Sequence, residues 1–310
     1  MAARDPWDVI VVGGGPAGLS AALMLGRCRR RVLVCDSGPK RNRASHALHG
    51  FLTRDGIAPA ELLRIARAQL RPYATVERRQ ARVTGLRRRG RLFEATLSRG
   101  RPVTARRVLL ATGVVDELPR WPGLPLFYGR SVFHCPYCDG WEFRERRLAA
   151  WGRTPATAGL ALKLTSWSRR VTLLTGGGYR LAPALRARLL KCGVQVREEP
   201  VARLAGRAGA LERVVLAAGT PVACDALFLT VPWRQACDLF RPLGCRLTRA
   251  GALIANRRSR THAHGVYAAG DASVDSQLAV VAASEGARAA IAIHEELLDE
   301  ELERESLSSP

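Results

Sequence analysis

The sequence predicts an α/β fold with two nucleotide-type domains, the second inserted into the first. An apolar strand at residues 8–12 leads through a glycine-rich turn into a helical stretch and a second strand at residues 31–38, which together form a βαβ unit. A similar pattern recurs at residues 147–178, after prolines at positions 119, 122 and 125 that mark a crossing between domains. The expected first domain combines residues 1–116 and 244–310, and the expected second domain covers residues 117–243.

The remaining elements follow from hydrophobic periodicity and from the position of glycines. Residues 58–71 have the pattern of an amphipathic helix. Residues 74–110 hold short β-prone pieces separated by glycines, which indicates a small antiparallel meander. A helix of small residues is expected at 277–298, and the acidic stretch that follows is expected to fray at its tip.

Composition and charge narrow the class of protein. The chain has 310 residues, 47% of them hydrophobic and 25% charged, which is the balance of an ordinary globular protein. The net charge of +22 comes almost wholly from arginine, because lysine occurs only at positions 40, 163 and 191. These arginines are spread along the chain and do not form a tract with interleaved aromatics, which disfavours nucleic-acid binding. No apolar run has the length of a membrane span and the first residues lack a signal-peptide core, so a cytoplasmic location is expected.

The clearest local motif is the glycine-rich turn after the first strand. Gly13, Gly15 and Gly18 follow the pattern GxGxxG between a strand and a helix. Gly13 permits the tight turn, Gly15 lets a pyrophosphate approach the backbone, and Gly18 lets the helix pack close to the strand. The N-terminus of the helix adds N–H groups and a positive dipole for the phosphates. Asp36 stands at the end of the second strand, where an acidic residue accepts hydrogen bonds from a ribose.

Two later segments favour FAD over NAD as the dinucleotide. Residues 104–113 (TARRVLLATG) and 261–271 (THAHGVYAAGD) resemble two further signatures of flavin disulfide reductases. In those proteins the aspartate of the last signature contacts the ribityl and phosphate side of FAD, and the resemblance gives that role to Asp271. The expected cofactor-binding residues are Gly13, Gly15, Pro16, Ala17, Gly18, Asp36, Ser37, Arg41, Asn42, Ala111, Thr112, Gly113, Gly270, Asp271, Gln277 and Leu278.

One cysteine pair has the spacing of a redox centre. Cys135 and Cys138 are separated by two residues and can close an exchange-ready disulfide, and a helix N-terminus at the pair would lower the pKa of the first thiol. Asp139 follows directly and can give or take a proton during thiol exchange. The alternative is half a zinc site with His134 as a third ligand. It is disfavoured because structural zinc needs four ligands and the sequence has no second CxxC or HxxxH.

With these FAD signatures, the CxxCDG motif resembles the low-molecular-weight thioredoxin reductase family over nearly the whole chain. The resemblance implies two Rossmann-like domains, with the cysteine pair and an NADPH site on the inserted one. It also implies that electrons pass between FAD and the disulfide, that Cys138 contacts the flavin and that Cys135 reacts with the substrate. In the same family Asp139 would move protons, the protein would be a homodimer and its partner would be a thioredoxin-like protein.

The NADPH turn of that family is altered here. Gly152 keeps the first glycine of a second GxGxx[GA] motif, but threonine stands at the second and third positions, Thr154 and Thr157. A Cβ at Thr154 should obstruct a pyrophosphate. The next strand runs into glycines 176–178 where the family has a basic cluster for the 2′-phosphate. Four arginines near this loop are candidates to replace that cluster: Arg153, Arg169, Arg170 and Arg180. NADPH binding therefore stays open.

Residues 41–53 (RNRASHALHGFLT) are a second departure from ordinary thioredoxin reductases. This segment resembles the dithiol oxidases that close disulfides in natural products such as gliotoxin and holomycin. Those enzymes pass electrons from a small dithiol, through the cysteine pair and the flavin, to O2. His46 and His49 would then be catalytic bases near the substrate thiols. The alternative, left open, is that both are loop histidines that pack against the flavin.

The expected function is an FAD-dependent thiol-disulfide oxidoreductase, with a dithiol oxidase that forms a disulfide in a small molecule as the first hypothesis. The catalytic residues of this hypothesis are Cys135, Cys138, Asp139, His46 and His49. An NADPH-dependent thioredoxin-disulfide reductase is the first alternative. A flavin-bound redox sensor without turnover is the second.

Overall fold

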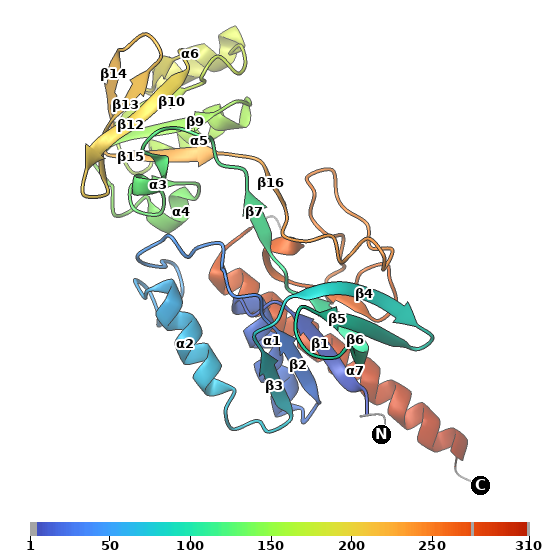
Figure 1. The fold of residues 1–310 in the computed structure, drawn as a ribbon. Helices are drawn as coiled ribbons and strands as arrows, with labels where there is room; N and C mark the ends of the chain where they lie inside the picture. Colours follow the sequence, from blue (N-terminus) through green and yellow to red (C-terminus); the bar gives the residue numbers. More distant parts are fainter. Residues whose placement is uncertain (1–4, 274–275, 309–310) are drawn as a thin grey trace. The chain divides into compact units, whose positions relative to one another are not determined.

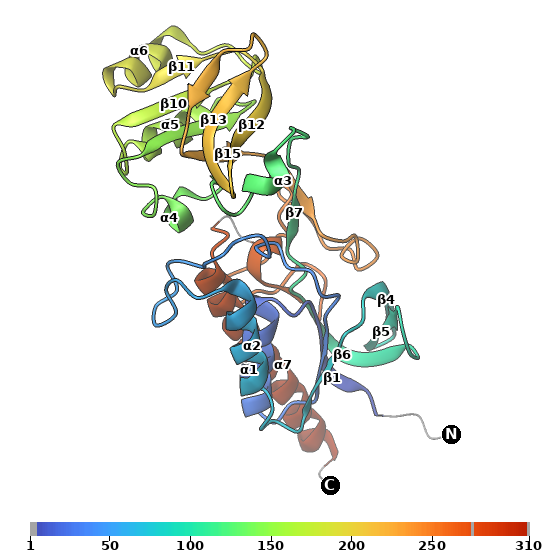
Figure 2. The same ribbon diagram turned by 60° about the vertical axis from the view of Figure 1, so that its left-hand side comes forward.

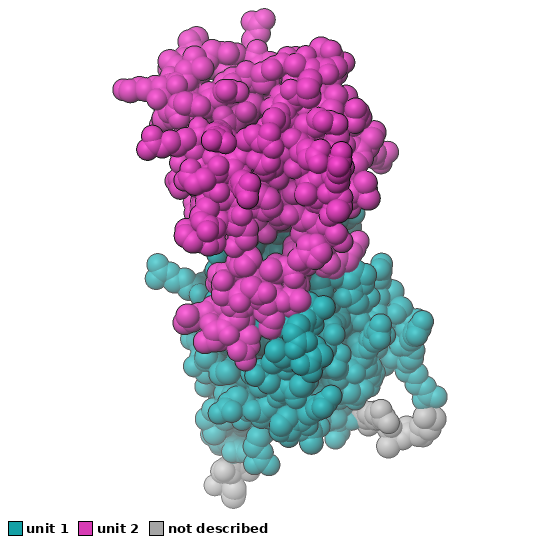
Figure 3. Space-filling model, turned by 90° about the vertical axis from the view of Figure 1, so that its left-hand side faces the viewer, with its two compact units in different colours: residues 1–41, 60–115, 234–310 teal, residues 42–59, 116–233 magenta. Residues whose placement is uncertain are grey.

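The computed structural model describes residues 5–273 and 276–308, and its contacts divide the chain into two compact units, coloured separately in Figure 3. Unit 1 comprises Met1–Arg41, Ala60–Val115 and Arg234–Pro310, and unit 2 comprises Asn42–Pro59 and Asp116–Trp233. The α/β fold expected from the sequence is confirmed. The expected domain boundaries stay a prediction, because compact units need not coincide with domains. None of the helices in the described part of the chain has the length and hydropathy of a membrane span.

Unit 1 is built on a seven-stranded sheet (Figure 1). The strands are β1 (Trp7–Val12), β2 (Val32–Cys35), β3 (Val76–Arg79), β4 (Val83–Arg89), β5 (Leu92–Leu97), β6 (Val103–Leu110) and β17 (Val266–Ala268). They lie in the order β3-β2-β1-β6-β5-β4, with β17 also paired to β6. The pairs among β1, β2, β3, β6 and β17 are parallel, whereas β4, β5 and β6 pair antiparallel.

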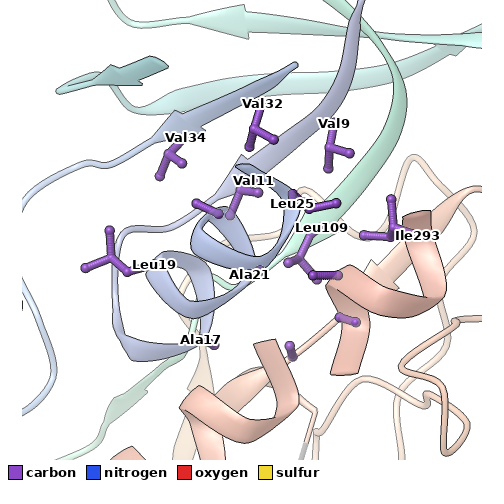
Figure 4. Close-up of a cluster of buried hydrophobic side chains, with 14 of the residues drawn as sticks. Val9, Val11, Ala17, Leu19, Ala21, Leu25, Val32, Val34, Leu109 and Ile293 are labelled. Atoms are coloured by element: carbon purple, nitrogen blue, oxygen red, sulfur yellow. The ribbon is translucent and has the colours of Figure 1, made fainter. Parts of the chain in front are cut away.

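Helices cover one face of this sheet (Figures 1 and 2). They are α1 (Pro16–Arg27), α2 (Pro59–Gln69) and α7 (Ala279–Ser308), and a short 3-10 helix, η1 (Gly270–Ala272), precedes α7. Val9 and Val11 of β1 bury their side chains against α1 and α7, in a cluster that includes Leu25 and Ile293 (Figure 4). Ile10, between the two valines, packs on the opposite face. Both faces are buried, which is why β1 reads as a continuous apolar run.

Two details of unit 1 differ from the sequence-based expectation. The meander is confirmed for β4, β5 and β6, but β3 joins β2 in parallel. The last helix does not end near residue 298, because α7 runs to Ser308. Its acidic turns are held by ion pairs with three arginines of the strands and of the loop after α1: Arg30, Arg106 and Arg107. Sequence periodicity does not reveal such partners.

Unit 2 contains a parallel five-stranded sheet and a smaller antiparallel sheet. The parallel strands, in the order β11-β10-β9-β15-β8, are β8 (Val132–Phe133), β9 (Arg147–Gly152), β10 (Arg170–Leu174), β11 (Gln195–Arg197) and β15 (Ala226–Thr230). The antiparallel strands are β12 (Val201–Arg207), β13 (Ala210–Leu216) and β14 (Pro221–Ala223).

Four helices complete unit 2. They are α3 (Leu124–Phe127), α4 (Pro136–Asp139), α5 (Ala156–Leu164) and α6 (Pro183–Lys191). One face of the parallel sheet packs on α5 and α6, and the other packs on α3 and the antiparallel sheet. The strands β7 (Val114–Asp116) and β16 (Trp233–Gln235) pair with each other where the chain passes between the units.

Candidate active site

The parallel strands of unit 1 bring the expected cofactor-binding motifs to one edge of the sheet. Val12, the last residue of β1, is in register with Cys35 of β2 on one side and Leu110 of β6 on the other. Ala268 of β17 is in register with Leu110. The glycine turn, Asp36, residues 111–113 and residues 270–271 follow these strand ends directly. The four motifs therefore meet at the carboxyl edge of the sheet, where α/β folds bind ligands.

The turn after β1 has the shape that a dinucleotide phosphate requires. Gly13 has a φ of 117°, and a Cβ on it would lie 2.1 Å from the carbonyl oxygen of Ala111. A Cβ on Gly18 would lie 1.9 Å from the carbonyl oxygen of Gly13, so neither position accepts a side chain. A Cβ on Gly15 would meet no protein atom within 4 Å. Gly15 thus faces open space just before α1, and Pro16 and Ala17 form the first turn of that helix.

Asp36 is a buried carboxylate held by cationic neighbours. It accepts a hydrogen bond from the backbone N–H of Gly38 (3.0 Å), pairs with Lys40 and lies 3.5 Å from the guanidinium of Arg67. Burial raises the pKa of Asp36, but the hydrogen bonds and charges of these neighbours lower it further, so the pKa lies below 3.8. An ionised carboxylate at this place can accept hydrogen bonds from ribose hydroxyls. Lys40 and Arg67 were not singled out from the sequence.

Arg41 brings two distant parts of unit 1 together. Its guanidinium donates to a carboxylate oxygen of Asp271 (2.9 Å) and to the side-chain oxygen of Gln277 (2.6 Å). Behind them, the buried Glu285 of α7 accepts a hydrogen bond from the N–H of Gly270 (2.9 Å). Arg41 therefore contacts two other expected cofactor-binding residues, and Glu285, which holds Gly270, was marked by no sequence motif.

The other expected cofactor-binding residues take varied positions. Ser37 is exposed after β2, and Leu278 immediately precedes α7. Burial raises the pKa of the Cys237 thiol and the neighbouring Thr112 hydroxyl lowers it, and Gly113 has a φ of 67°. Asn42 begins the segment 42–59 that belongs to unit 2. Their contacts with FAD stay predictions.

The cysteine pair forms a disulfide in unit 2. Cys135 and Cys138 are bonded, with their Cα atoms 5.3 Å apart. Cys135 follows the edge strand β8 after one residue, His134, and is the N-cap of α4. Both cysteines are only partly buried. Next to the pair, the hydroxyl of Tyr128 lies 3.3 Å from Nδ1 of His134.

Asp139 and His49 belong to one group of titratable side chains beside this disulfide. Burial raises the pKa of Asp139 to about 7, the Glu142 carboxylate adds to the rise, and His49 opposes it. His49 comes from the segment 42–59; its Nε2 lies 3.5 Å from Glu142, and its Nδ1 lies 3.4 Å from Asp55. His46, in contrast, is exposed and has no hydrogen bond or ion pair among residues 5–273 and 276–308. Glu142 and Asp55 were not singled out from the sequence.

The turn after β9 in unit 2 differs from the turn after β1 because Thr154 and Thr157 stand where the first turn has Gly15 and Gly18. The hydroxyl oxygen of Thr157 occupies the space beside Gly152, where a Cβ would lie 2.3 Å from it. The N–H of Thr157 donates to the carbonyl of Thr154 (3.1 Å). One of the backbone groups that would face a phosphate is therefore already used.

The loop after β10 lies directly on this turn. A Cβ on Gly178 would be 2.7 Å from Cβ of Arg153, and a Cβ on Gly176 would be 2.9 Å from the indole nitrogen of Trp151. Burial raises the pKa of the Tyr179 hydroxyl and the neighbouring Thr157 hydroxyl lowers it, although neither group makes a hydrogen bond of good geometry within the described chain. In a Rossmann-like domain this space holds the nucleotide. Thr154 and Thr157 thus stand where the turn of unit 1 has Gly15 and Gly18, which disfavours a pyrophosphate there.

Comparisons with known proteins identify the class. A family model described as pyridine nucleotide-disulphide oxidoreductase matches residues 7–286, and the chain belongs to this family. A probable thioredoxin reductase of Arthroderma benhamiae is 31% identical over 330 residues, which cover 96% of this chain and 82% of that protein.

Solved structures agree with this assignment. The oxidoreductase from Agrobacterium tumefaciens is 36% identical, with a TM-score of 0.89 and coverage of 95% of this chain and 99% of that one. The structure of HlmI is 35% identical, with a TM-score of 0.94 and coverage of 99% and 98%. The expected thioredoxin reductase-like family is confirmed, and the protein is a disulfide oxidoreductase.

The family binds FAD, and unit 1 fits this cofactor. The open space at Gly15 and the ionised Asp36 are the two features that the pyrophosphate and a ribose require. In the turn after β9, Thr154 stands where unit 1 has the open Gly15.

Proposed function

We propose that this protein oxidises small-molecule dithiols to disulfides, with O2 as the final electron acceptor and without a need for NADPH. The observation that carries the proposal is the turn after β9, where Thr154 and Thr157 stand at the positions of Gly15 and Gly18 and the Thr157 hydroxyl lies against Gly152. The same chain keeps an intact cysteine pair and an open FAD turn. The turn that would bind the electron donor NADPH is thus altered, whereas the cysteine pair and the FAD turn are intact.

The chemistry at the pair is a two-step thiol exchange. A substrate thiol first loses its proton to Asp139 or His49, because the thiolate is the nucleophile. Its sulfur attacks Cys135, a mixed disulfide forms and Cys138 leaves as a thiolate. The second substrate thiol, deprotonated in turn, attacks the substrate sulfur of the mixed disulfide and releases Cys135. The substrate has then lost two electrons and two protons, and the cysteine pair has gained them.

FAD, when bound, supplies a two-electron acceptor for the reduced pair, and O2 can regenerate it. We assign its pyrophosphate to Gly13–Gly18 and the N-terminus of α1, and a ribose to Asp36. We assign the third contact region for FAD to Arg41, Asp271 and Gln277, and the fourth to residues 111–113.

Anaerobic flavin reduction tests the proposal. Purified yellow protein is mixed with dithiothreitol, NADPH or NADH, and the absorbance of oxidised flavin is followed. We expect the dithiol to bleach the flavin and both pyridine nucleotides to leave it oxidised. C138S is the matched control, because it keeps the fold of the pair's helix but cannot re-form the disulfide, so the dithiol should leave its flavin oxidised. Rapid bleaching by NADPH, followed by turnover of thioredoxin, would overturn the proposal.

A second candidate is an NADPH-dependent thioredoxin-disulfide reductase. The curated relative named above carries the name thioredoxin reductase. Arg153 and Arg180 are exposed next to the loop after β10 and are available for a phosphate if that loop moves. The same experiment separates the two candidates, since this one requires NADPH to bleach the flavin.

A homodimer and a cytoplasmic location remain proposals drawn from the family resemblance and the sequence. Light scattering on the purified holoprotein measures the first.

A further inference from the structure

The segment 42–59 is fixed onto unit 2 by backbone packing. Gly129, which has a φ of 77°, lies against this segment so closely that a Cβ would be 2.5 Å from the carbonyl carbon of Ala44. Within the segment, Leu48 and Ile57 form an antiparallel bridge. The fold of unit 2 therefore sets the position of His49 relative to the cysteine pair. In the sequence the two are far apart, at positions 49 and 135.

Two carboxylates face the two nitrogens of the His49 ring. Asp55 accepts a hydrogen bond from the N–H of Gly50 (2.7 Å), which closes the loop and places its other oxygen 3.4 Å from Nδ1. On the other side, Oε1 of Glu142 lies 3.5 Å from Nε2. Glu142 stands three residues after Asp139, in the turn that follows α4. The imidazole thus connects the segment 42–59 with the helix of the disulfide.

We propose that Asp55 and Glu142 are positioning residues that hold the His49 imidazole between two carboxylates, and that His49 and Glu142 act in opposite directions on the proton carried by Asp139. The inference rests on the proposed thiol exchange, in which Asp139 gives or takes a proton, and adds the residues that tune this transfer. A carboxylate near Asp139 disfavours its ionised form, whereas a protonated imidazole favours it. The charged groups that act on Asp139 are Glu142 and His49, and those that face His49 are Glu142 and Asp55.

Asp139 and its charged neighbours keep a proton available at the cysteine pair near neutral pH. Burial and Glu142 raise the pKa of Asp139 to about 7, with His49 opposing them, so both protonation states are populated there. A group in this condition can accept a proton from an entering thiol and return it to a leaving cysteine thiolate. Without Glu142 the carboxyl would be more fully ionised at neutral pH and less able to return the proton.

The test is the pH profile of anaerobic flavin reduction by dithiothreitol in the holoprotein. E142Q should move the inflection assigned to Asp139 to lower pH, because it removes the neighbouring negative charge. H49Q should move the same inflection to higher pH, because it removes the opposing positive charge. D55N should act like H49Q with a smaller displacement, because it removes one of the two carboxylates that hold the imidazole in place. The matched control is E145Q, which changes an exposed glutamate of the same loop that does not act on Asp139.

If Glu142 and His49 had only a structural role, E142Q and H49Q would not shift the inflection assigned to Asp139 in opposite directions. Profiles of E142Q and H49Q that coincide with the wild type, or that move in the same direction, would overturn this inference. A wild-type protein that dithiothreitol cannot reduce at any pH would instead contradict the proposed function, so the two failures are distinguishable. Flavin content and the far-ultraviolet circular dichroism spectrum of each variant identify any that misfold, and H49N then replaces H49Q.

Discussion

The raised pKa of Asp139 makes the stability of the protein depend on pH in a defined direction. The pKa of this carboxyl is 3.8 in the unfolded chain and about 7 in the folded protein, chiefly because of burial and also because of Glu142. Between these values the folded protein binds one more proton than the unfolded chain. The free energy of unfolding therefore falls as pH rises, by about 1.4 kcal/mol per pH unit. Above about 7 both states are ionised, and the accumulated loss is about 4 kcal/mol.

Asp139→Asn removes this titration. D139N should match the wild type where the carboxyl is protonated in both folded and unfolded states, and should become more stable than the wild type as pH rises, by at most about 4 kcal/mol above neutrality. Urea unfolding of the oxidised holoprotein at a series of pH values, followed by tryptophan fluorescence, measures the difference. D238N, which changes an exposed aspartate, is the control. Parallel pH curves for D139N and the wild type would refute the reasoning that Asp139 is a buried proton carrier.

Two further predictions concern unit 1. Gly15→Val should abolish retention of FAD, measured as flavin absorbance per protein after purification, while the free energy of unfolding of the apoprotein changes by no more than about 0.5 kcal/mol, since a Cβ at this position meets no protein atom within 4 Å. A G15V protein that keeps its flavin would contradict the assignment of the turn. Arg107→Ala should lower the free energy of unfolding by about 3–5 kcal/mol, because it leaves two carboxylates of α7 without their buried partner. R203A, at an exposed arginine, should change it by less than about 0.5 kcal/mol, and an equal loss in both variants would count against the role of the buried ion pairs.

The parts of the site that follow strand ends were predictable from sequence, because each motif is local. Gly13, Gly15 and Gly18 are needed by the turn itself, and Asp36 and Asp271 are placed by the strands that precede them. The register of a parallel sheet then brings these strand ends together without further information. The cysteine pair was predictable for the same reason, since two residues between the cysteines suffice to close the disulfide.

The residues that tune the site were not predictable, because their partners lie far away in the chain. Arg67 reaches Asp36 from α2, and Glu285 reaches Gly270 from α7. His46 and His49 were equivalent in sequence, and only the fold of the segment 42–59 separates an exposed ring from one held by Asp55. The length of α7 was underestimated for a related reason. Acidic residues at the end of a helix predict fraying only when no arginine forms ion pairs with them.

The segment 42–59 also determines how this protein could be divided or recombined. The chain crosses from one unit to the other four times, and the first two crossings bracket this short loop. A fragment or chimera made from residues 116–233 would carry the disulfide and Asp139 but would leave His49 and Asp55 behind. A transplant of the complete redox module therefore needs two inserts from separate regions of the gene. Recombination that exchanges only the long insert would pair a disulfide from one parent with the histidine of another.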